Sequence, residues 1–545
     1  MQSTYDSNGN DLGWGDQSVI AVIKHWPSDA PGEGGREAHN KYGKYNVYPG
    51  NAFMTGLIPF VDGGLNLDSA TKVAGGVMAS YSIAYTSDES LGKLVGSAFS
   101  DYKIGLLRSY GYDDVIITDS SVTSPASERF TTKDHGVEDL TVAEKDYMAI
   151  TAGVDQILAS NNYGEQADIL AAYDLYVQEH GQDDADLRFR ESARRILRNE
   201  FRVGIFENAY VDCAAAVAIV DEDQASASLS LTAGQQSVVM LKNTDDTIRQ
   251  AAGDAKPTVY IPMVYTPAAR TPMGVIPASW GLPISESTAS GYFNIVTDTV
   301  GQPTGEAGDD GQPSYTQNDI IRASAADLAA CEYAIFFLDS PAVGSGYDKA
   351  TETYLPISLQ YGPYTANSAG VREESIAGDL VERQVESPYG VVTEYVKENR
   401  SYYGQSTQAS NLYQLEAALS CISALPESTR VVFCIDAVNP FVASEFESEA
   451  DAILTGFGMS SEAYLSIIAG QAEPSALLPF QMPANMETVE AQYEDVPRDM
   501  ECYVDSAGNT YDFGFGLNWS GVIQDARTEK YCVPALPEPA TQPVQ

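Results

Sequence analysis

The sequence predicts an α/β protein built from at least two layered domains. Short unbroken runs of β-branched and other apolar residues, bounded by turn residues, alternate with helical patterns in both halves of the chain. Such runs are typical of strands that are buried on both faces, as in parallel sheets. At 545 residues the chain also exceeds the size of one ordinary hydrophobic core. A segment rich in Ala, Ser and Asp, residues 211–236, separates the two alternating regions.

The clearest strand of the first region lies in residues 110–120. After a glycine turn, four β-branched residues follow one another and the run ends at Asp119. In a β/α barrel the carboxyl ends of the strands form the rim where catalytic side chains gather, so Asp119 is a candidate catalytic carboxylate. The alternative is that Asp119 only caps the next helix, because Asp is a favoured N-cap residue.

Two further strands of the first region also end in polar side chains. Residues 19–23 form the first strand, and Lys24 and His25 follow directly at its end. Residues 73–81 form the second, with Met78 and Tyr81 near its end. A Lys beside a His is a suitable pair of donors for sugar hydroxyls. Lys24 and His25 are therefore candidate binding residues.

A loop rich in Gly and charged residues, residues 31–39, follows the first of these strands. Tyr42, Tyr45 and Tyr48 come next, either as stacking surfaces for sugar rings or as packing for the loop. We favour packing, because aromatic side chains bury large areas wherever they lie.

The remaining elements continue the α/β alternation. Residues 152–157 begin one more short unit, and residues 186–206 predict an amphipathic helix with apolar residues four apart. Residues 340–410 form a long polar insertion without periodicity, which is typical of functional or disordered loops. The strands expected in the second region are residues 258–262, 333–338, 430–435 and 452–454. A helix is expected at residues 411–422.

Charge and composition exclude several classes of function. A net charge of −45 argues against nucleic acids and anionic membrane surfaces, which need a basic face, but is compatible with a neutral sugar. No apolar run is long enough to span a membrane, and the first twenty residues do not resemble a signal peptide. The six scattered cysteines are expected to be buried or partly buried free thiols, which favours a cytoplasmic location.

The sequence gives no sign of a metal or an organic cofactor. Only four histidines are present, without a His-x-x-x-His pair, so no metal site is predicted. Neither a phosphate-binding Walker loop nor a dinucleotide-binding glycine fingerprint is found. We therefore expect a small-molecule partner and no cofactor.

Taken together, six segments in order resemble glycoside hydrolase family 3. They are residues 24–39, 112–119, 194–208, 238–243, 470–479 and 511–517. The resemblance implies the C-terminal part of a (β/α)8 TIM-like barrel followed by an α/β sandwich domain. The barrel part would span residues 1–210, the linker 211–236, the sandwich 237–524 and a loose, proline-rich tail 525–545.

The resemblance also implies an activity: hydrolysis of terminal non-reducing β-D-glucosyl or related residues by a retaining double displacement. Asp119 would be the nucleophile. A retaining enzyme needs a second carboxyl, roughly 5–5.5 Å away, to protonate the leaving oxygen. The residues that would contact the substrate are Lys24, His25, Arg36, His39, Met78 and Tyr81.

The second carboxyl is expected in the long insertion. Glu398, in the segment 397–402, best resembles the family's acid/base turn. Its rivals are Glu373, Glu374 and Glu394. A different branch of the family, the N-acetylglucosaminidases, takes its acid/base from an acid-x-His pair, which residues 37–39 could supply. The attached sandwich domain favours the glucosidase branch.

Two features depart from the family pattern. Ser120 stands where the family usually has Trp, which weakens inferences about the leaving-group subsite. Before residue 211 there are only about four strand–helix units, whereas a barrel needs eight. We therefore expect Met1 to be an internal methionine of a longer protein, whose missing N-terminal segment completes the site, and we expect the chain alone to be poorly soluble or a homo-oligomer. The alternative is a truncated, inactive sugar-binding protein.

Overall fold

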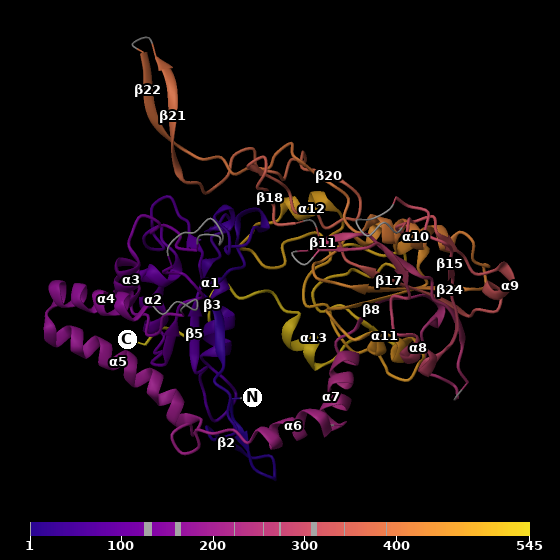
Figure 1. The fold of residues 1–545 in the computed structure, drawn as a ribbon, viewed down its shortest axis with the longest axis horizontal. Helices are drawn as coiled ribbons and strands as arrows, with labels where there is room; N and C mark the ends of the chain where they lie inside the picture. Colours follow the sequence, from indigo (N-terminus) through magenta and orange to yellow (C-terminus); the bar gives the residue numbers. More distant parts are fainter. Residues whose placement is uncertain are drawn as a thin grey trace.

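The computed structural model describes residues 2–124, 133–158, 165–222, 224–253, 255–271, 274–306, 313–342, 344–387 and 390–544. Two groups of elements lie side by side, and helices α6 (Cys213–Glu222) and α7 (Gln224–Gln235) connect them below (Figure 1). The first group contains a parallel sheet with helices around it, and the second a larger mixed sheet with helices on both faces. The predicted α/β class is confirmed. The expected linker is helical over most of its length.

The first sheet has the strand order β3 (Val22–Trp26), β5 (Gly76–Ala79) and β7 (Val115–Ile117), all parallel. The strand predicted at residues 19–23 was placed about three residues too early. Its pairing with β5 begins at Val22 and ends with Trp26 opposite Ala79. Lys24 and His25 therefore belong to the strand itself instead of following it.

Helices α2 (Asp101–Ser109), α3 (Val142–Ala152), α4 (Glu165–His180) and α5 (Gln182–Arg202) surround this sheet (Figure 1). Ser100 caps α2 by accepting the Lys103 N–H, and Thr141 and Glu144 form a capping box at the start of α3. The core centres on Trp26, which has no exposed surface and donates its indole N–H to the Lys103 carbonyl at 2.8 Å. This core fixes β3 and β5 against α2.

Helix α5 is amphipathic as predicted. Its charged face makes the polar contacts with the residues around the first sheet. Asp155 has a fully buried side chain, which pairs with Arg108 at 2.6 Å and with Arg195 of α5 at 2.9 Å. The apolar residues Leu197 and Phe201 are exposed instead. A buried carboxylate needs cationic partners, and α5 supplies them.

The second sheet has eight strands in the order β14-β9-β17-β24-β25-β8-β26-β27. The first five strands run parallel to one another. Each of the last three strands pairs antiparallel with the strand before it in this order. Helix α10 (Leu412–Ile422) covers one face, and α8 (Glu286–Tyr292) and α11 (Ser461–Ile468) cover the other. The four strands predicted in this region are confirmed, as is the helix at α10. The strand bounds are β8 Val239–Asn243, β9 Thr258–Tyr260, β14 Asn294–Val296, β17 Tyr333–Asp339, β24 Arg430–Asp436, β25 Ala452–Gly456, β26 Leu517–Asn518 and β27 Gly521–Val522.

The long insertion packs on the loop that follows β3. Tyr42 stacks on Tyr347 with ring centroids 4.6 Å apart, and the buried Tyr45 donates its hydroxyl to Asp379 at 2.6 Å. These tyrosines therefore pack the loop, as we favoured. A hairpin of β21 (Leu380–Ser387) and β22 (Gly390–Lys397) projects from the insertion, away from both sheets (Figure 1).

Short elements complete the chain, and most of the short strands form two-stranded pairs. The strands are β1 Thr4–Tyr5, β2 Asp11–Gly13, β4 Tyr45–Asn46, β6 Ile83–Ala84, β10 Val264–Thr266, β11 Ala269–Thr271, β12 Gly274–Ile276, β13 Ser279–Gly281, β15 Thr299–Val300, β16 Ile320–Ile321, β18 Tyr347–Asp348, β19 Thr353–Tyr354, β20 Tyr364–Thr365 and β23 Ser406–Thr407. The helices are α1 Phe53–Gly56, α9 Ala325–Leu328, α12 Met486–Ala491 and α13 Ala526–Tyr531.

The C-terminal tail is not loose over its described residues. After α13 it returns to the first region, where Asp62 accepts the backbone N–H groups of Ala540 and Thr541. The Val544 N–H then donates to the Ser109 carbonyl at 2.8 Å. These backbone contacts hold a proline-rich segment that composition alone suggested to be free.

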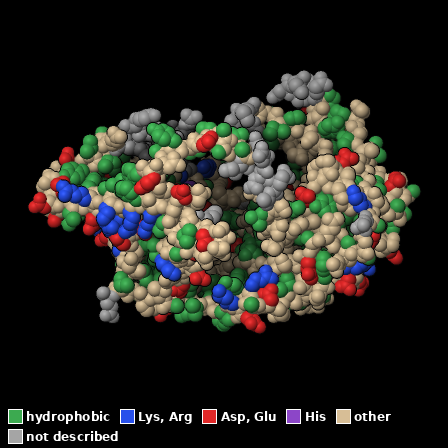
Figure 2. All heavy atoms as spheres, turned by 90° about the horizontal axis from the view of Figure 1, so that it is seen from below, with side chains coloured by type: hydrophobic (Ala, Val, Ile, Leu, Met, Phe, Trp, Pro, Cys, Tyr) green, Lys and Arg blue, Asp and Glu red, His purple; other side chains and the backbone are tan. Residues whose placement is uncertain are grey.

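The surface and the thiols complete the description. Figure 2 shows Asp and Glu side chains scattered over one face, with Lys and Arg gathered at the end where Figure 1 places α5. Three cysteines are buried and Cys502 is half-buried, but Cys213 and Cys532 are exposed, so the expectation of buried thiols was wrong for these two. Within the described ranges, no helix has the length and apolar character required to span a bilayer.

Candidate functional site

Asp119 lies two residues beyond the end of β7, at the edge where β3 and β5 also end. Asp119 is only 7% exposed, and the Ser120 N–H donates to its Oδ1 at 2.6 Å. A carboxylate at the carboxyl end of a parallel strand can point at a ligand that lies above the sheet edge. This backbone contact fixes one oxygen of the carboxylate.

His25 of β3 lies next to the other oxygen of this carboxylate. Its Nε2 is 3.0 Å from Asp119 Oδ2, and its Nδ1 is 2.6 Å from Asp29 Oδ2. The contact with Asp119, and then that with Asp29, raises the pKa of His25 from its ordinary 6.5 to about 9. The imidazole is therefore positively charged at neutral pH and bridges two carboxylates. Sequence reasoning missed Asp29, although it stands four residues after His25.

The Asp119 carboxylate is held in its charged form. Burial alone would raise its pKa, but contacts with His25, the Ser120 N–H and Tyr81 outweigh burial and lower the pKa to about 2. An ionised, partly desolvated carboxylate is the form that a nucleophile needs.

Tyr81 forms the next wall of the site. Its hydroxyl donates to the Ser120 carbonyl at 2.6 Å and accepts from Lys133 Nζ at 3.2 Å. His39 lies against the same ring, with centroids 4.9 Å apart in an edge-to-face arrangement. The nitrogen Nδ1 of His39 contacts the Glu37 carboxylate. Tyr81 therefore links the Asp119 strand to the loop that carries His39.

Two more of the residues expected to contact the substrate lie on the same strands. Met78 is half-buried in β5, paired in register with Ile117 just before Asp119. Lys24 precedes His25 in β3 and is exposed, without an ion pair to any residue in the described part of the chain. The structure thus brings His25, Tyr81 and Asp119 together, while Lys24 and Met78 lie on the adjacent strands β3 and β5.

Arg36 does not join this group. Its side chain is buried, with the residue only 3% exposed, and its guanidinium carbon lies 4.8 Å above the Tyr354 ring. Burial lowers the pKa of Arg36. Tyr354 belongs to the long insertion, so Arg36 faces the second region instead of Asp119.

Glu398 lies at the base of the projecting hairpin. Its carboxylate accepts the Tyr354 hydroxyl at 3.0 Å and pairs with Arg400 at 2.8 Å. Its rivals Glu373 and Glu374 are exposed. Over the residues that the structure describes, no contact joins Glu398 to Asp119 or His25. Glu398 is instead connected through Tyr354 to Arg36, and so to the loop after β3.

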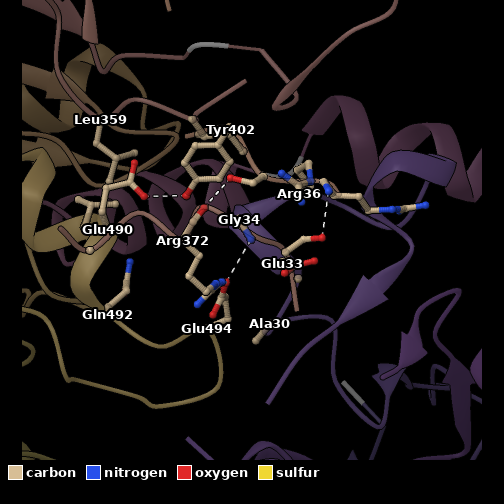
Figure 3. Close-up of a pocket in the computed structure, with 18 of the residues that line it drawn as sticks. Ala30, Glu33, Gly34, Arg36, Leu359, Arg372, Tyr402, Glu490, Gln492 and Glu494 are labelled. Carbon is tan, nitrogen blue, oxygen red and sulfur yellow. Dashed lines mark hydrogen bonds and ion pairs between the residues drawn. The ribbon is translucent and has the colours of Figure 1, made fainter. Parts of the chain in front are cut away.

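A second polar cluster lies where that loop meets the second region (Figure 3). Arg372 pairs with Glu494, which also accepts the Gly34 N–H at 3.3 Å. The Tyr402 hydroxyl donates to Glu490 at 2.6 Å. Sequence reasoning singled out the segments of Gly34 and Tyr402 but missed Arg372, Glu490 and Glu494, which belong to none of the motifs.

No cofactor site is evident from the donor sets in the described ranges. There, no three His, Cys, Asp or Glu side chains are arranged so that they could hold a metal ion together.

Comparison with known proteins identifies relatives over nearly the whole chain. No family model matches it. The chain is 26% identical over 514 residues to a probable β-glucosidase C of Aspergillus oryzae, covering 93% of this chain and 60% of that protein. It is 30% identical over 276 residues to a periplasmic β-glucosidase/β-xylosidase of Dickeya chrysanthemi, covering 46% of this chain and 40% of that protein.

Solved structures show the same fold. A β-glucosidase of Erythrobacter marinus superposes with a TM-score of 0.53 at 19% identity, covering 92% of this chain and 58% of that chain. A β-glucosidase involved in saponin metabolism from intestinal bacteria gives a TM-score of 0.54 at 16% identity, covering 92% and 61%. The chain spans about 60% of the length of the full-length β-glucosidase C relatives. The comparisons therefore agree with the resemblance seen in the motifs: over 93% of its length the chain is similar to β-glucosidases.

Proposed function

We propose that this chain carries the nucleophile and donor residues of a β-glucosidase that releases terminal non-reducing β-D-glucosyl or related residues. The observation that carries the proposal is the Asp119 carboxylate at the end of β7, ionised and 3.0 Å from a charged His25. The names of its relatives support the same class of reaction. The net charge of −45 is consistent with a neutral substrate.

The proposed fold places this site on a barrel rim. We take β3, β5 and β7 with their helices, residues 1–210, as the C-terminal part of a (β/α)8 barrel, and residues 237–524 as the sandwich domain. The parallel order of the three strands and the helices between them support this interpretation. The 211–236 linker and the 525–545 tail complete the proposed division.

In the proposed mechanism an Asp119 oxygen attacks the anomeric carbon, and the leaving oxygen takes a proton from the acid/base. The bond to the leaving group breaks as the glycosyl–Asp119 ester forms, and water later hydrolyses this ester. His25 neutralises the carboxylate and orients it. Lys24, exposed on the same strand, would donate to the sugar hydroxyls, and Met78 and Tyr81 would form the walls of the sugar subsite.

We propose Glu398 as the acid/base, because it lies at the base of the hairpin within the insertion that covers the loop after β3. Its contacts with Tyr354 and Arg400 are polar and can be exchanged for contacts with a substrate. In a retaining mechanism the Glu398 carboxyl would act roughly 5–5.5 Å from that of Asp119.

A second candidate is supported by one observation. The Glu37 carboxylate contacts His39, and His39 packs on Tyr81 beside Ser120. This arrangement suits the acid-x-His pair of the N-acetylglucosaminidase branch. In that case His39 would transfer the proton, and the substrate would carry an N-acetyl group.

The test is hydrolysis of an aryl β-glucoside by the chain and by three variants. Asp119→Asn should lower turnover by at least about 100-fold, since the covalent intermediate cannot form. Glu398→Gln should slow substrates with poor leaving groups far more than activated aryl glucosides, and azide should rescue it partly. If His39→Ala shows that pattern instead, the N-acetylglucosaminidase branch is correct. Sugar binding without turnover by the parent chain would support a binding protein.

A further inference from the structure

A polar cavity of about 360 Å³ lies between the loop after β3, the long insertion and α12. These three segments are distant from one another in sequence, and Figure 3 shows their side chains around one space. The cavity does not include Asp119 or His25 among its walls. The reaction proposed at Asp119 therefore does not use this cavity.

The charged groups of this cavity balance one another. Three arginines and three glutamates line it, so the walls carry no net formal charge. A balanced polar wall does not select an anion or a cation, and it favours a neutral ligand with many hydroxyls. The six residues are Glu33, Arg36, Arg372, Arg400, Glu490 and Glu494.

Two of these residues have polar atoms without a hydrogen-bond partner in the described part of the chain. Arg36 has no partner for Nε or Nη1, although the residue is only 3% exposed. Glu494 has none for Oε2, while its other oxygen binds Arg372 and the Gly34 N–H. Buried groups of this kind normally have partners, so donors and an acceptor remain available for a ligand.

The remaining walls suit a sugar ring. Ile357, Leu359 and Val489 give the cavity an apolar side, and Tyr402 adds an aromatic ring whose hydroxyl is fixed by Glu490. A pyranose has apolar C–H faces and a polar rim, so it can pack on such a side while its hydroxyls reach Arg36. Sites for small molecules typically combine apolar walls with a few oriented polar groups.

The loop after β3 connects this cavity to the Asp119 site. Arg36 lines the cavity, and three residues later His39 packs on Tyr81, which contacts Ser120 next to Asp119. Three residues span at most about 11 Å, so the cavity wall and the wall of the first sugar subsite are close. Arg400, also in the cavity wall, pairs with Glu398 at 2.8 Å.

We propose that this cavity binds a second, neutral sugar unit, on the leaving-group side of the bond that is cleaved. The inference rests on the proposed function, because it assumes that the first unit lies at Asp119. It places this subsite in the loop and the insertion, away from the position of Ser120. The chain should then prefer a β-linked disaccharide to a simple glucoside.

The test is calorimetric titration of the full chain with methyl β-D-glucoside and with a thio-linked, uncleavable β-glucosyl disaccharide. The parent should bind the disaccharide at least about tenfold more tightly, the worth of one or two hydrogen bonds to a charged group. Arg36→Met should abolish this preference. The melting temperature of this variant is measured in parallel, because Arg36 also contacts the Tyr354 ring.

Two further variants complete the experiment. Glu494→Gln should also reduce the preference, which keeps the proposal testable if Arg36→Met does not fold. Glu487→Gln is the matched control, since Glu487 is exposed on the same helix as Glu490 and does not line the cavity. The proposal would be overturned by equal affinity of the parent for both sugars, or by a preference that survives in both cavity variants. Binding of inorganic phosphate in place of sugar would also overturn it. Failure of Asp119→Asn to reduce hydrolysis would overturn the proposed function while leaving this binding result unaffected.

Discussion

Replacing Asp119 by Asn should lower the pKa of His25. The rise of this pKa from 6.5 to about 9 corresponds to roughly 3.4 kcal/mol, at about 1.36 kcal/mol per pH unit. Asp119 and Asp29 share this interaction, and the His25 side chain is 16% exposed, so solvent screens part of it. We therefore assign about 1–2 kcal/mol to Asp119, which predicts a His25 pKa lower by about one pH unit in Asp119→Asn.

The measurement is an NMR titration of the histidine ring protons between pH 5 and pH 11. The chain has four histidines, and His25→Gln assigns the signal. A raised pKa in the folded state stabilises the protein fully below the unfolded value of 6.5, and this stabilisation is lost as the pH rises through about 9. The free energy of unfolding should thus fall between pH 6.5 and pH 9, and less steeply in Asp119→Asn. A His25 pKa that stays the same in this variant would refute the ion pair.

Two predictions concern stability and the thiols. Asp155→Asn should lower the free energy of unfolding by about 3–5 kcal/mol, measured by urea denaturation, since it leaves the partly buried Arg108 without its carboxylate and removes one of the two carboxylates that pair with Arg195. A loss under about 1 kcal/mol would contradict this. A thiol reagent followed by mass spectrometry should label the exposed Cys213 rapidly at pH 8, whereas Cys434, buried and with its pKa raised by burial, should react only after unfolding. Equal rates at both would contradict the burial.

Local pattern was sufficient to predict much of the fold. Val115 to Ile117 forms β7 because an unbroken β-branched run buries both of its faces, and α10 follows its apolar period. The register of β3 could not be predicted, because it depends on pairing with β5. The exposure of the apolar face of α5 could not be predicted for the same reason. Arginines of α5 pair with Asp155, a partner that is distant in sequence.

The candidate site was predictable where residues share a strand edge. Asp119 and His25 meet because parallel strands end at one edge, so both could be found from the sequence. Arg36 was placed with them by its loop, yet it faces the insertion, and Asp29 was missed. Long loops fold by contacts with remote segments, so neither periodicity nor spacing indicates which side chains they bring together.

Trapping of the covalent intermediate tests the central assignment most directly. An activated 2-deoxy-2-fluoro-β-glucoside should form a stable ester in a retaining enzyme, because the fluorine slows the hydrolysis step that regenerates the carboxylate. Incubation of the chain with this reagent, digestion and mass spectrometry should find one added fluoroglucosyl group on the peptide that contains Asp119. Asp119→Asn should carry none. A label on another carboxylate, or hydrolysis of aryl β-glucosides by a chain that never acquires a label on Asp119, would contradict the account.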